Sequence, residues 1–438
     1  MGMAKKKTPC SAAAQDRLLR TRSSSSSSTL HWGAKAKRSR PALGSRSRSS
    51  SRDWSDLDDG PAGLIAERVL TNGGAIDYIR FRAVCRPWRR CCGDPRTRAL
   101  LEDSRLHPRG WIMLLGEEEE LEAAAAPHSI RRQFLNVSTG QCIQVDVPEL
   151  RDHGVIRSIS DDGLLLLLRK GTGGSAVVRL LNPLTRQVAE LPPITDLEYP
   201  PGHIGRCSPC TAAVVDGRWV LLYIHRAGED GTLAFAKPGN IDERWVLVKI
   251  KSTGFLWPTM SFAGRFYGVA GDSIMVMDTT NGLPPRLVVA AKLAVQIRGM
   301  LETVHLVENG GEMMLVHRRM RPVRGVVDGK YYGCKRACKL YRVNLASGKT
   351  TPAAARGRAI FVGHCRALSV SPQVFPGISA NAVYPALGLL ERRERQQIVA
   401  YHLRDGTTES FSSNDNDTRS GLPHPWSIAD CLATYVSG

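Results

Sequence analysis

Residues 211–224 read Thr-Ala-Ala-Val-Val-Asp-Gly-Arg-Trp-Val-Leu-Leu-Tyr-Ile, two apolar runs with an Asp-Gly pair between them. Because such a pair readily takes the positive φ angles of a hairpin turn, the stretch predicts two antiparallel strands. The same arrangement returns at residues 265–278, where Gly271 and Asp272 separate two apolar runs. Short apolar runs with turn residues about every 8 to 12 positions are typical of all-β proteins. They continue to the C-terminus, which predicts a β body over residues 131–438.

A short motif recurs in this body: an apolar residue, Asn or Asp, two further residues, then Ser, Thr or Asn with Gly or Arg. In its four copies, the Asn or Asp of the motif is Asn136, Asn182, Asp278 and Asn344, and a degenerate fifth copy contains Asp405. The first four lie 46, 96 and 66 residues apart. A period of about 40 to 50 residues is that of a four-stranded blade. We therefore expect a β-propeller of six or seven blades; the alternative is a double β-sandwich.

Residues 53–95 predict three short helices. Asp59 or Gly60 can cap the first, with Pro61 at its first position, and the Asn-Gly-Gly run that follows ends it. Asp77 is expected to cap the second helix, and Pro87 to interrupt it before a third segment. So small a module cannot bury all its apolar side chains internally. We expect some of the module's apolar side chains to face a partner or another domain. The six candidates are Leu57, Leu64, Ile65, Ile79, Val84 and Trp88.

The same residues resemble a plant F-box. The resemblance lies in Trp54-Ser-Asp-Leu57, Leu64-Ile-Ala-Glu-Arg-Val69 and above all Val84-Cys-Arg-Pro-Trp-Arg89. It implies that the module docks onto a Skp-type adaptor, and through it a cullin, of a ubiquitin ligase, with the six side chains facing the adaptor. The family usually has a Leu-Leu pair where this chain has Pro61-Ala62, a change that removes about 2–4 kcal/mol of apolar burial. The alternative is a small helical cap packed on the body.

The body is similar to a second family. Leu180-Leu-Asn-Pro-Leu-Thr185, Gly264-Arg-Phe-Tyr-Gly268, Gly357-Arg-Ala-Ile-Phe-Val-Gly363 and residues 369–378 resemble, in this order, the KIB-type propeller domains that follow an F-box in plants. The resemblance covers residues 131–438. It implies that the propeller is the half that recognises a target protein, whose identity and binding residues the sequence does not indicate.

Charge is concentrated at the N-terminus. The chain has 438 residues and a net charge of +19, and residues 1–52 contribute 13 basic side chains, one acid (Asp16) and 13 serines. Such a composition predicts disorder. The tail reads as a nuclear-import address at Lys35–Arg40, an RNA-associated Ser-Arg segment, a transit peptide, or a tail without a specific role. The other 386 residues carry only +7.

Several classes are excluded by the composition. The strongest apolar run, residues 164–168, is far shorter than the roughly 20 residues that span a bilayer. No secretory signal is apparent, so the eleven cysteines are expected to be reduced thiols of a nuclear or cytoplasmic protein. An acidic, Ala-rich insertion at residues 117–126 is expected within a linker, residues 96–130.

Chemical motifs give little support to catalysis. Two cysteine pairs have metal-like spacing, but they lie 124 residues apart, so buried or half-buried thiols are expected instead of a zinc site. The residues concerned are His203, Cys207, Cys210, Cys334 and Cys338. Neither a phosphate-binding loop nor a nucleophile elbow is present in the sequence. No catalytic residue, metal or cofactor is therefore expected.

The sequence thus predicts a multidomain α plus all-β protein: a disordered tail (1–52), a three-helix F-box-like module (53–95), a linker (96–130) and a β-propeller (131–438). The expected function is that of a non-catalytic substrate receptor in a ubiquitin ligase, bringing a target close to the conjugating enzyme. Neither nucleic acid nor membrane is an expected partner. The alternatives are a basic RNA-associated or nuclear scaffold protein and a propeller-based hydrolase.

Overall fold

The structure is a computed structural model in which the chain divides into two units, residues 1–52 and 53–438. The described residues all lie in the second unit. They are 54, 57–114, 131–159, 162–170, 176–193, 211–224, 231–241, 243–250, 259–279, 285–297, 302–322, 326–327, 330–331, 334–363, 366–385, 399–410 and 428–437. The predicted tail and the acidic insertion at residues 117–126 lie outside the described residues. In these described residues, no helix is long and apolar enough to cross a membrane.

The helices of the N-terminal module follow the predicted breaks with shifted ends. Helix α1 (Asp59–Val84) is interrupted at Gly74, whose φ of 73° and ψ of −168° are non-helical, so it consists of two helices across a kink. Its N-cap is Asp58, and Pro61 therefore lies at the third position instead of the first. Helix α2 (Arg86–Arg90) begins before Pro87, not after it. A proline is tolerated in a first turn because its missing N–H has no helical partner there.

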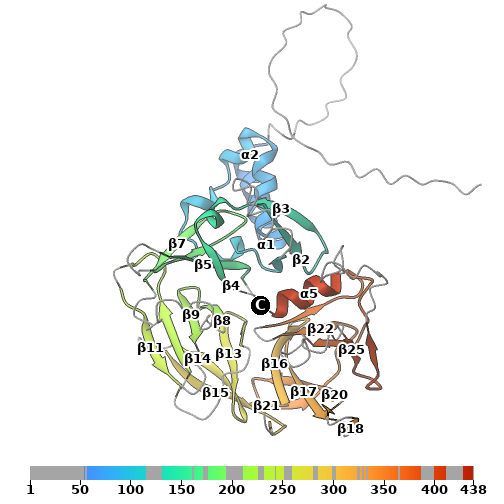
Figure 1. Cartoon of the computed structure of the whole chain (residues 1–438). Coiled ribbons are helices and arrows are strands. Elements are labelled where there is room, and N and C mark those ends of the chain that lie inside the picture. The colour runs from blue at the N-terminus through green and yellow to red at the C-terminus, as the bar shows by residue number, and fades with distance from the viewer. Residues whose placement is uncertain are drawn as a thin grey trace, which may run out of the picture. The chain divides into compact units, whose positions relative to one another are not determined.

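Antiparallel sheets follow one another along the chain (Figure 1). The first has the order β1 (Trp111–Met113), β2 (Arg131–Asn136), β3 (Cys142–Asp146). The second has the order β4 (Gly154–Ile159), β5 (Leu164–Lys170), β6 (Ala176–Leu181), β7 (Val188–Leu191). The third runs β11 (Val246–Lys249), β10 (Thr232–Ala236), β9 (Trp219–Ile224), β8 (Thr211–Val215). Strand β1 lies in the segment predicted as a linker, so the β body reaches back to Trp111.

Two further groups of four strands are joined in one sheet. The first group is β12 (Met260–Phe262), β13 (Arg265–Ala270), β14 (Ser273–Asp278) and β15 (Arg286–Lys292). The second is β21 (Lys349–Pro352), β20 (Cys334–Asn344), β17 (Glu312–Pro322) and β16 (Glu302–Asn309). A single parallel pair, Lys292 with Lys349, joins them. Between β17 and β20, the chain forms the short hairpin of β18 (Val326–Val327) and β19 (Lys330–Tyr331).

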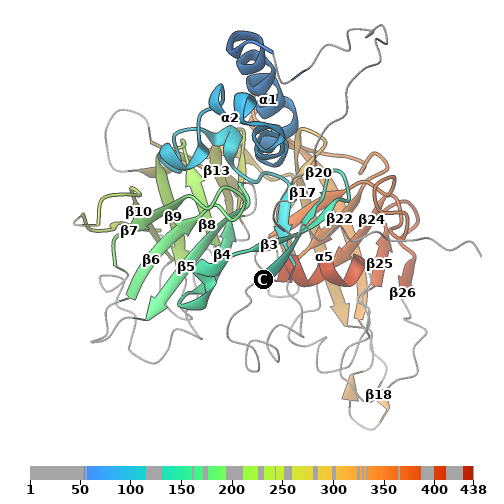
Figure 2. The ribbon, with the colours of Figure 1, turned by 90° about the horizontal axis from the view of Figure 1, so that it is seen from above.

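The last sheet has the order β23 (Ala367–Val370), β22 (Ala359–Val362), β24 (Ala382–Pro385), β25 (Val399–His402), β26 (Thr408–Ser410). Strand β4 lies against β8, β8 against β12, β12 against β16 and β16 against β23. These contacts line up inner strands of the second, third, eight-stranded and last sheets. Figures 1 and 2 show the sheets side by side, and Figure 1 shows them around a common centre. The prediction of a β-propeller is confirmed.

One predicted β segment is a helix. Residues 428–437 form α5, whereas the sequence pattern predicts strands as far as residue 438. The apolar side chains of Leu432, Tyr435 and Val436 are spaced by three and four residues, the spacing of a helix face. They pack with Ile112 of β1, Leu135 of β2 and Phe361 of β22. Helix α5 therefore closes the ring between the first sheet and the last (Figure 1).

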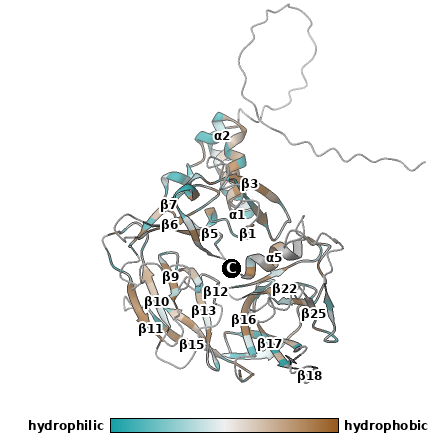
Figure 3. Ribbon diagram, in the orientation of Figure 1, coloured by the Kyte–Doolittle hydropathy of each residue, from teal (hydrophilic) through white to brown (hydrophobic). Residues whose placement is uncertain are grey.

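The run of leucines in β5 explains how neighbouring sheets pack. Leu164 and Leu166 lie in one core cluster with Val214 and Leu222 of the third sheet. Leu165 and Leu167 point to the other face and pack with Trp111 and Phe134 of the first. Both faces of the strand are buried, so its sequence is continuously apolar instead of alternating. The same brown, hydrophobic colouring marks strands of the other sheets in Figure 3.

The recurring Asn motif forms the turn between the last two strands of a sheet. Asn136 lies between β2 and β3, Asn182 between β6 and β7, and Asn344 between β20 and β21. The side-chain oxygen of each accepts a hydrogen bond from a backbone N–H two or three residues later. Asp405 does the same between β25 and β26. The connection from β10 to β11 lacks the motif, which accounts for the interval of 96 residues in the series. The repeat therefore marks equivalent positions of successive sheets.

Candidate functional site

The helical module has its own small core. Ala62, Ala66 and Leu70, each four residues apart, turn one side of the first half of α1 inward. Tyr78 and Phe81 from the second half pack with Ala66 and Leu70, together with Cys92 and Leu106. The opposite side of the first half of α1 therefore faces solvent.

Three of the six predicted adaptor-facing residues are exposed, two of them on this side of α1 and the third, Val84, at its C-terminal end. Leu64 is 75% exposed, Val84 63% and Ile65 40%. Leu57 and Ile79 are half-buried. Trp54, 66% exposed, is a further apolar side chain that the sequence reasoning left out, although an aromatic residue just before a helix is a readable signal. Isolated exposed apolar residues are ordinary, but several in one small module are typical of an interaction surface. We call Trp54, Leu64, Ile65 and Val84 the exposed apolar set.

Trp88, the sixth predicted residue, has a different environment. Its ring stacks on Phe81 with the centroids 4.4 Å apart. Its Nε1 donates a hydrogen bond to the backbone oxygen of Trp54 at 2.9 Å. The side chain is half-buried and fastens the segment that precedes α1 to the second half of that helix. Trp88 thus holds Trp54, one member of the exposed apolar set, in place.

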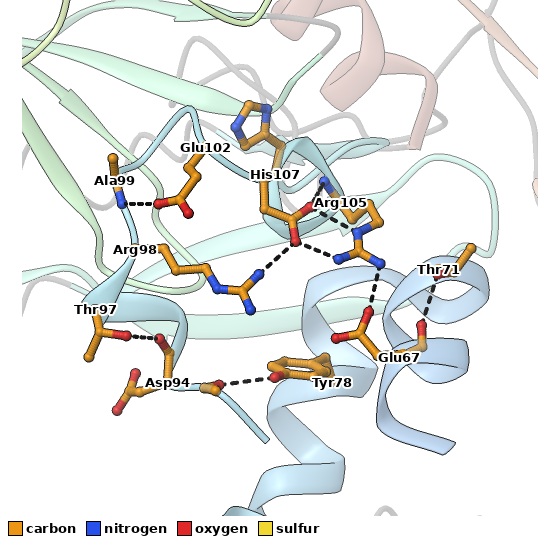
Figure 4. Close-up of polar contacts among 12 residues, drawn as sticks. Glu67, Thr71, Tyr78, Asp94, Thr97, Arg98, Ala99, Glu102, Arg105 and His107 are labelled. Atoms are coloured by element: carbon orange, nitrogen blue, oxygen red, sulfur yellow. Dashed lines mark hydrogen bonds and ion pairs between the residues drawn. The ribbon is translucent and has the colours of Figure 1, made fainter. Parts of the chain in front are cut away.

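Ion pairs fix the module to the short 3₁₀ turns after it (Figure 4). Arg105, in the turn Ser104–Leu106, donates to Glu67 of α1 at 2.8 Å and to Asp103 at 2.7 Å. Arg98 donates to the same Asp103 at 3.1 Å. The hydrogen bonds from Arg105 hold the pKa of Asp103 below its usual value. The charge on Asp103 is thereby favoured over its neutral form, and the turn is tied to the helix.

A buried polar network joins this segment to the second sheet. The imidazole of His107 lies between Asp162, 3.0 Å from Nδ1, and the backbone oxygen of Leu100, 3.1 Å from Nε2. Since that carbonyl can only accept, Nε2 carries a proton. Asn182 donates to the Leu106 oxygen at 2.9 Å, and Gln187 to that of Arg98 at 3.0 Å. The module is therefore anchored on the propeller by these residues, of which only Asn182, a copy of the recurring motif, stood out in the sequence.

A cavity of about 770 Å³ is lined by residues near the ends of the inner strands. The turns between β8 and β9 and between β12 and β13 border it, with Asp216 and Ala263 both at a φ of 50°. The three carboxylates of its lining all have partners. Asp162 pairs with His107 and Arg109, Asp216 accepts from the Thr279 hydroxyl, and Glu308 from the Gly311 N–H.

Only some of the residues of the two cysteine pairs are among the described residues. His203, Cys207 and Cys210 lie outside the described residues, as does the side chain of Cys334. Cys338 is buried, and burial raises the pKa of its thiol to about 12. It is therefore a protonated, unreactive thiol at neutral pH. Among the residues that the structure describes, no group of three or more His, Cys, Asp or Glu side chains is placed to hold a metal.

The order and the turns of the sheets agree with the comparison of this chain with known families. Residues 134–406 match the KIB1-4 beta-propeller. The chain belongs to the KIB1-4 β-propeller family. A propeller of this family fits a role in protein interaction, and it leaves the helical module outside the matched residues. No curated protein matches the chain significantly.

Solved structures resemble this KIB1-4 propeller only distantly. A polysaccharide lyase of family PL25, an ulvan lyase, is 14% identical with a TM-score of 0.30, over 57% of this chain and 67% of its own. A putative 6-phosphogluconolactonase from Bacteroides uniformis is 11% identical with a TM-score of 0.26, over 64% and 90%. A prolyl endopeptidase is 12% identical with a TM-score of 0.24, over 68% and 55%. At such TM-scores, these likenesses carry no argument about activity.

Proposed function

We propose that the chain is a non-catalytic substrate receptor of a Skp–cullin–F-box ubiquitin ligase, acting in the nucleus, the cytoplasm or both. Residues 53–95 are its F-box and bind the Skp-type adaptor, and the propeller binds the protein to be ubiquitinated. The exposed apolar set carries the proposal. Leu64 alone leaves three quarters of its surface in water, although the module has a core of its own.

The departure from the usual F-box pattern weakens the docking surface less than the sequence suggests. Of the two positions where a leucine pair is expected, Ala62 is turned inward and is almost fully buried. Only Pro61 is exposed there. One docking position instead of two is then lost. Full burial of a leucine or valine side chain contributes about 1.5–3 kcal/mol, so Leu64 and Val84 can supply most of the docking energy.

We also propose six blades. The first and last sheets and the two four-stranded sheets account for four of them. The eight-stranded sheet supplies the other two, because its two groups of four strands share a single bridging pair. The first blade has three strands and is completed by α5. The recurring Asn motif supports the count, since each copy lies between the last two strands of a different group.

The test is capture of a purified Skp-type adaptor by the full chain and its variants. We expect the unchanged chain to bind and Leu64→Asp to lose at least tenfold in affinity, because a carboxylate would be desolvated in an apolar interface. Val289→Asp is the matched control: Val289 is 55% exposed on β15 of the propeller. Absence of adaptor binding by the unchanged chain would overturn the proposal, as would equal losses in the two variants.

A further inference from the structure

The largest cavity considered above lies inside the ring of sheets. Strands β8, β12, β16 and β23 and helix α5 all contribute to its lining, and its volume is about 770 Å³. Ligand sites in proteins commonly measure about 300–1,000 Å³. Met260 and Leu306 belong to an apolar part of the wall, and the described lining also includes the cations of Arg109, Arg358 and Arg366. An apolar wall with a few charged groups orients a ligand that has one polar end.

Arg358, just before β22, is held in a fixed position. Its Nε donates to the Ser369 hydroxyl at 2.8 Å, and its Nη2 donates to the Ser369 backbone oxygen at 2.9 Å. The Ser369 hydroxyl donates in turn to the side-chain oxygen of Asn309 at 2.7 Å, and both of these residues are buried. Within the described residues, no carboxylate pairs with Arg358, and its Nη1 has no partner. The guanidinium therefore keeps one donor nitrogen for a ligand.

A second guanidinium reaches the same cavity from the neighbouring first sheet. Arg109 lies two residues before β1, and Ile112 of that strand shares a core cluster with Ala359 of β22. The contact of Arg109 with Asp162 is 3.4 Å long, and the Arg109 side chain is 59% exposed. So exposed an ion pair contributes little free energy, so a second anion can attract the guanidinium without a large loss.

Acidic side chains border the cavity on other sheets. Asp216 lies in the turn after β8 and Glu308 near the end of β16, and both are exposed. A ligand with several phosphate groups would bring like charges toward these carboxylates, which costs binding energy. A polypeptide that ends in the cavity brings a single carboxylate, and the N–H groups behind it are donors for Asp216 and Glu308. The mixed charge of the lining therefore favours a peptide over a polyanion.

The position of the cavity favours the end of a chain. Because inner strands surround it, an internal segment of a partner would have to fold back on itself or pass through the ring. A chain end needs room for one extended strand only. Charge-assisted hydrogen bonds between a guanidinium and a carboxylate are about twice as strong as neutral ones, and C-terminal carboxylates are recognised by such donors in other peptide sites.

We propose that this cavity binds the C-terminal end of a target protein, with the terminal carboxylate against Arg358 and Arg109 and the last side chains on the apolar wall. The inference rests on the proposed function, since it names the class of target that the propeller half takes. Arg358 is the main contact because its hydrogen bonds to Ser369 fix its direction before a ligand arrives.

The experiment uses the immobilised full chain and a pool of octapeptides with a free C-terminus and four randomised final positions. A second pool of the same composition ends in C-terminal amides, and the retained peptides are quantified by mass spectrometry. We expect the free-acid pool to be retained at least tenfold more than the amide pool, because the amide carries no charge. This comparison needs no variant, so it remains valid if a substitution in the lining unfolds the protein.

Variants locate the site. Arg358→Gln should lower retention of the free-acid pool at least tenfold, and Arg109→Gln at least threefold. Arg404→Gln is the matched control, because it removes an exposed guanidinium outside the lining of the cavity, and it should retain the pool as the unchanged chain does. Thermal unfolding of each variant shows whether it is folded.

The other outcomes contradict the proposal. Equal retention of the two pools would overturn the terminal carboxylate as the ligand. Equal losses in Arg404→Gln and Arg358→Gln would overturn the cavity as the site. Tighter binding of N-acetylglycine than of the retained peptides would overturn the peptide in favour of a small carboxylic acid.

Adaptor capture separates this proposal from the ligase role. Arg358→Gln should capture the Skp-type adaptor as the unchanged chain does, because the exposed apolar set is intact in it. If the unchanged chain retains the free-acid pool but captures no adaptor, the ligase role falls and the site for a chain end stands. If it captures the adaptor but retains neither pool, the ligase role stands and the site falls.

Discussion

The first and second sheets of the propeller complete themselves in different ways. The second is built from β4 to β7, four strands in unbroken chain order. The first has three strands, and α5, from the far end of the chain, packs beside them. Leu166 of β5 and Leu432 of α5 are both completely buried. The comparison shows that a side chain can be completely buried in either kind of sheet, even where its neighbours include a residue 320 positions away in the sequence, as Ile112 is from Leu432.

The paired variants Leu166→Ala and Leu432→Ala test whether the helix closes the ring as firmly as a strand does. Each removes a fully buried leucine, and such changes cost about 2–5 kcal/mol of the free energy of unfolding, depending on how far the site collapses. We expect both in this range in urea denaturation monitored by tryptophan fluorescence. Val289→Ala, exposed on β15, should change the free energy by less than about 0.5 kcal/mol. A change below about 1 kcal/mol for Leu432→Ala alone would show that α5 does not hold the ring.

A smaller effect on the free energy of unfolding is expected when the Asn of the recurring motif is replaced in each of the two sheets. The Asn182 side chain is completely buried and also donates to the Leu106 oxygen, whereas Asn136 caps an exposed turn. Asn182→Ala should cost about 2–3 kcal/mol because it leaves buried groups without partners, and Asn136→Ala about 0.5–1 kcal/mol. Thermal unfolding of the two variants beside the unchanged chain measures the difference. Equal shifts of the melting temperature would mean that the hydrogen bond from Asn182 to the Leu106 oxygen adds nothing to stability.

The smallest effect concerns the junction of the two sheets and depends on pH. His153 lies just before β4, and its Nδ1 is 3.0 Å from the Glu149 backbone oxygen. Burial, with a smaller contribution from Arg179, lowers the pKa of His153 from 6.5. The unfolded chain then takes up a proton at a higher pH than the folded chain does, so stability falls as the pH drops through 6.5. His153→Gln should flatten the melting temperature between pH 7 and pH 5.5; an unchanged slope would contradict the assignment.

Turn chemistry explains how much of the fold could be predicted. Asp216 and Gly217 connect two strands whose bounds agree with the apolar runs around them, because positive φ angles at a two-residue turn leave few alternatives. The Asn motif likewise located the outer turns. Helix α5 was missed because its apolar residues were read within a β context. Strand β1 was missed because three residues carry no periodicity.

Contacts between distant segments account for what the sequence could not show at the candidate sites. The apolar residues of α1 were recognisable, but their exposure was not: Leu64 and Ala62 are two residues apart and face opposite sides of the helix. The pair of His107 and Asp162 joins residues 55 positions apart and leaves no local pattern.

Closure by α5 has a consequence for the timing of synthesis. Strand β1 leaves the ribosome early, whereas the helix that covers it begins more than 300 residues later. At about 5–20 residues per second, that interval lasts from about 15 seconds to a minute. During it, Ile112 and Leu135 have no partner from α5 and present apolar surface. We therefore expect chaperones to bind the nascent chain until α5 has emerged from the ribosome.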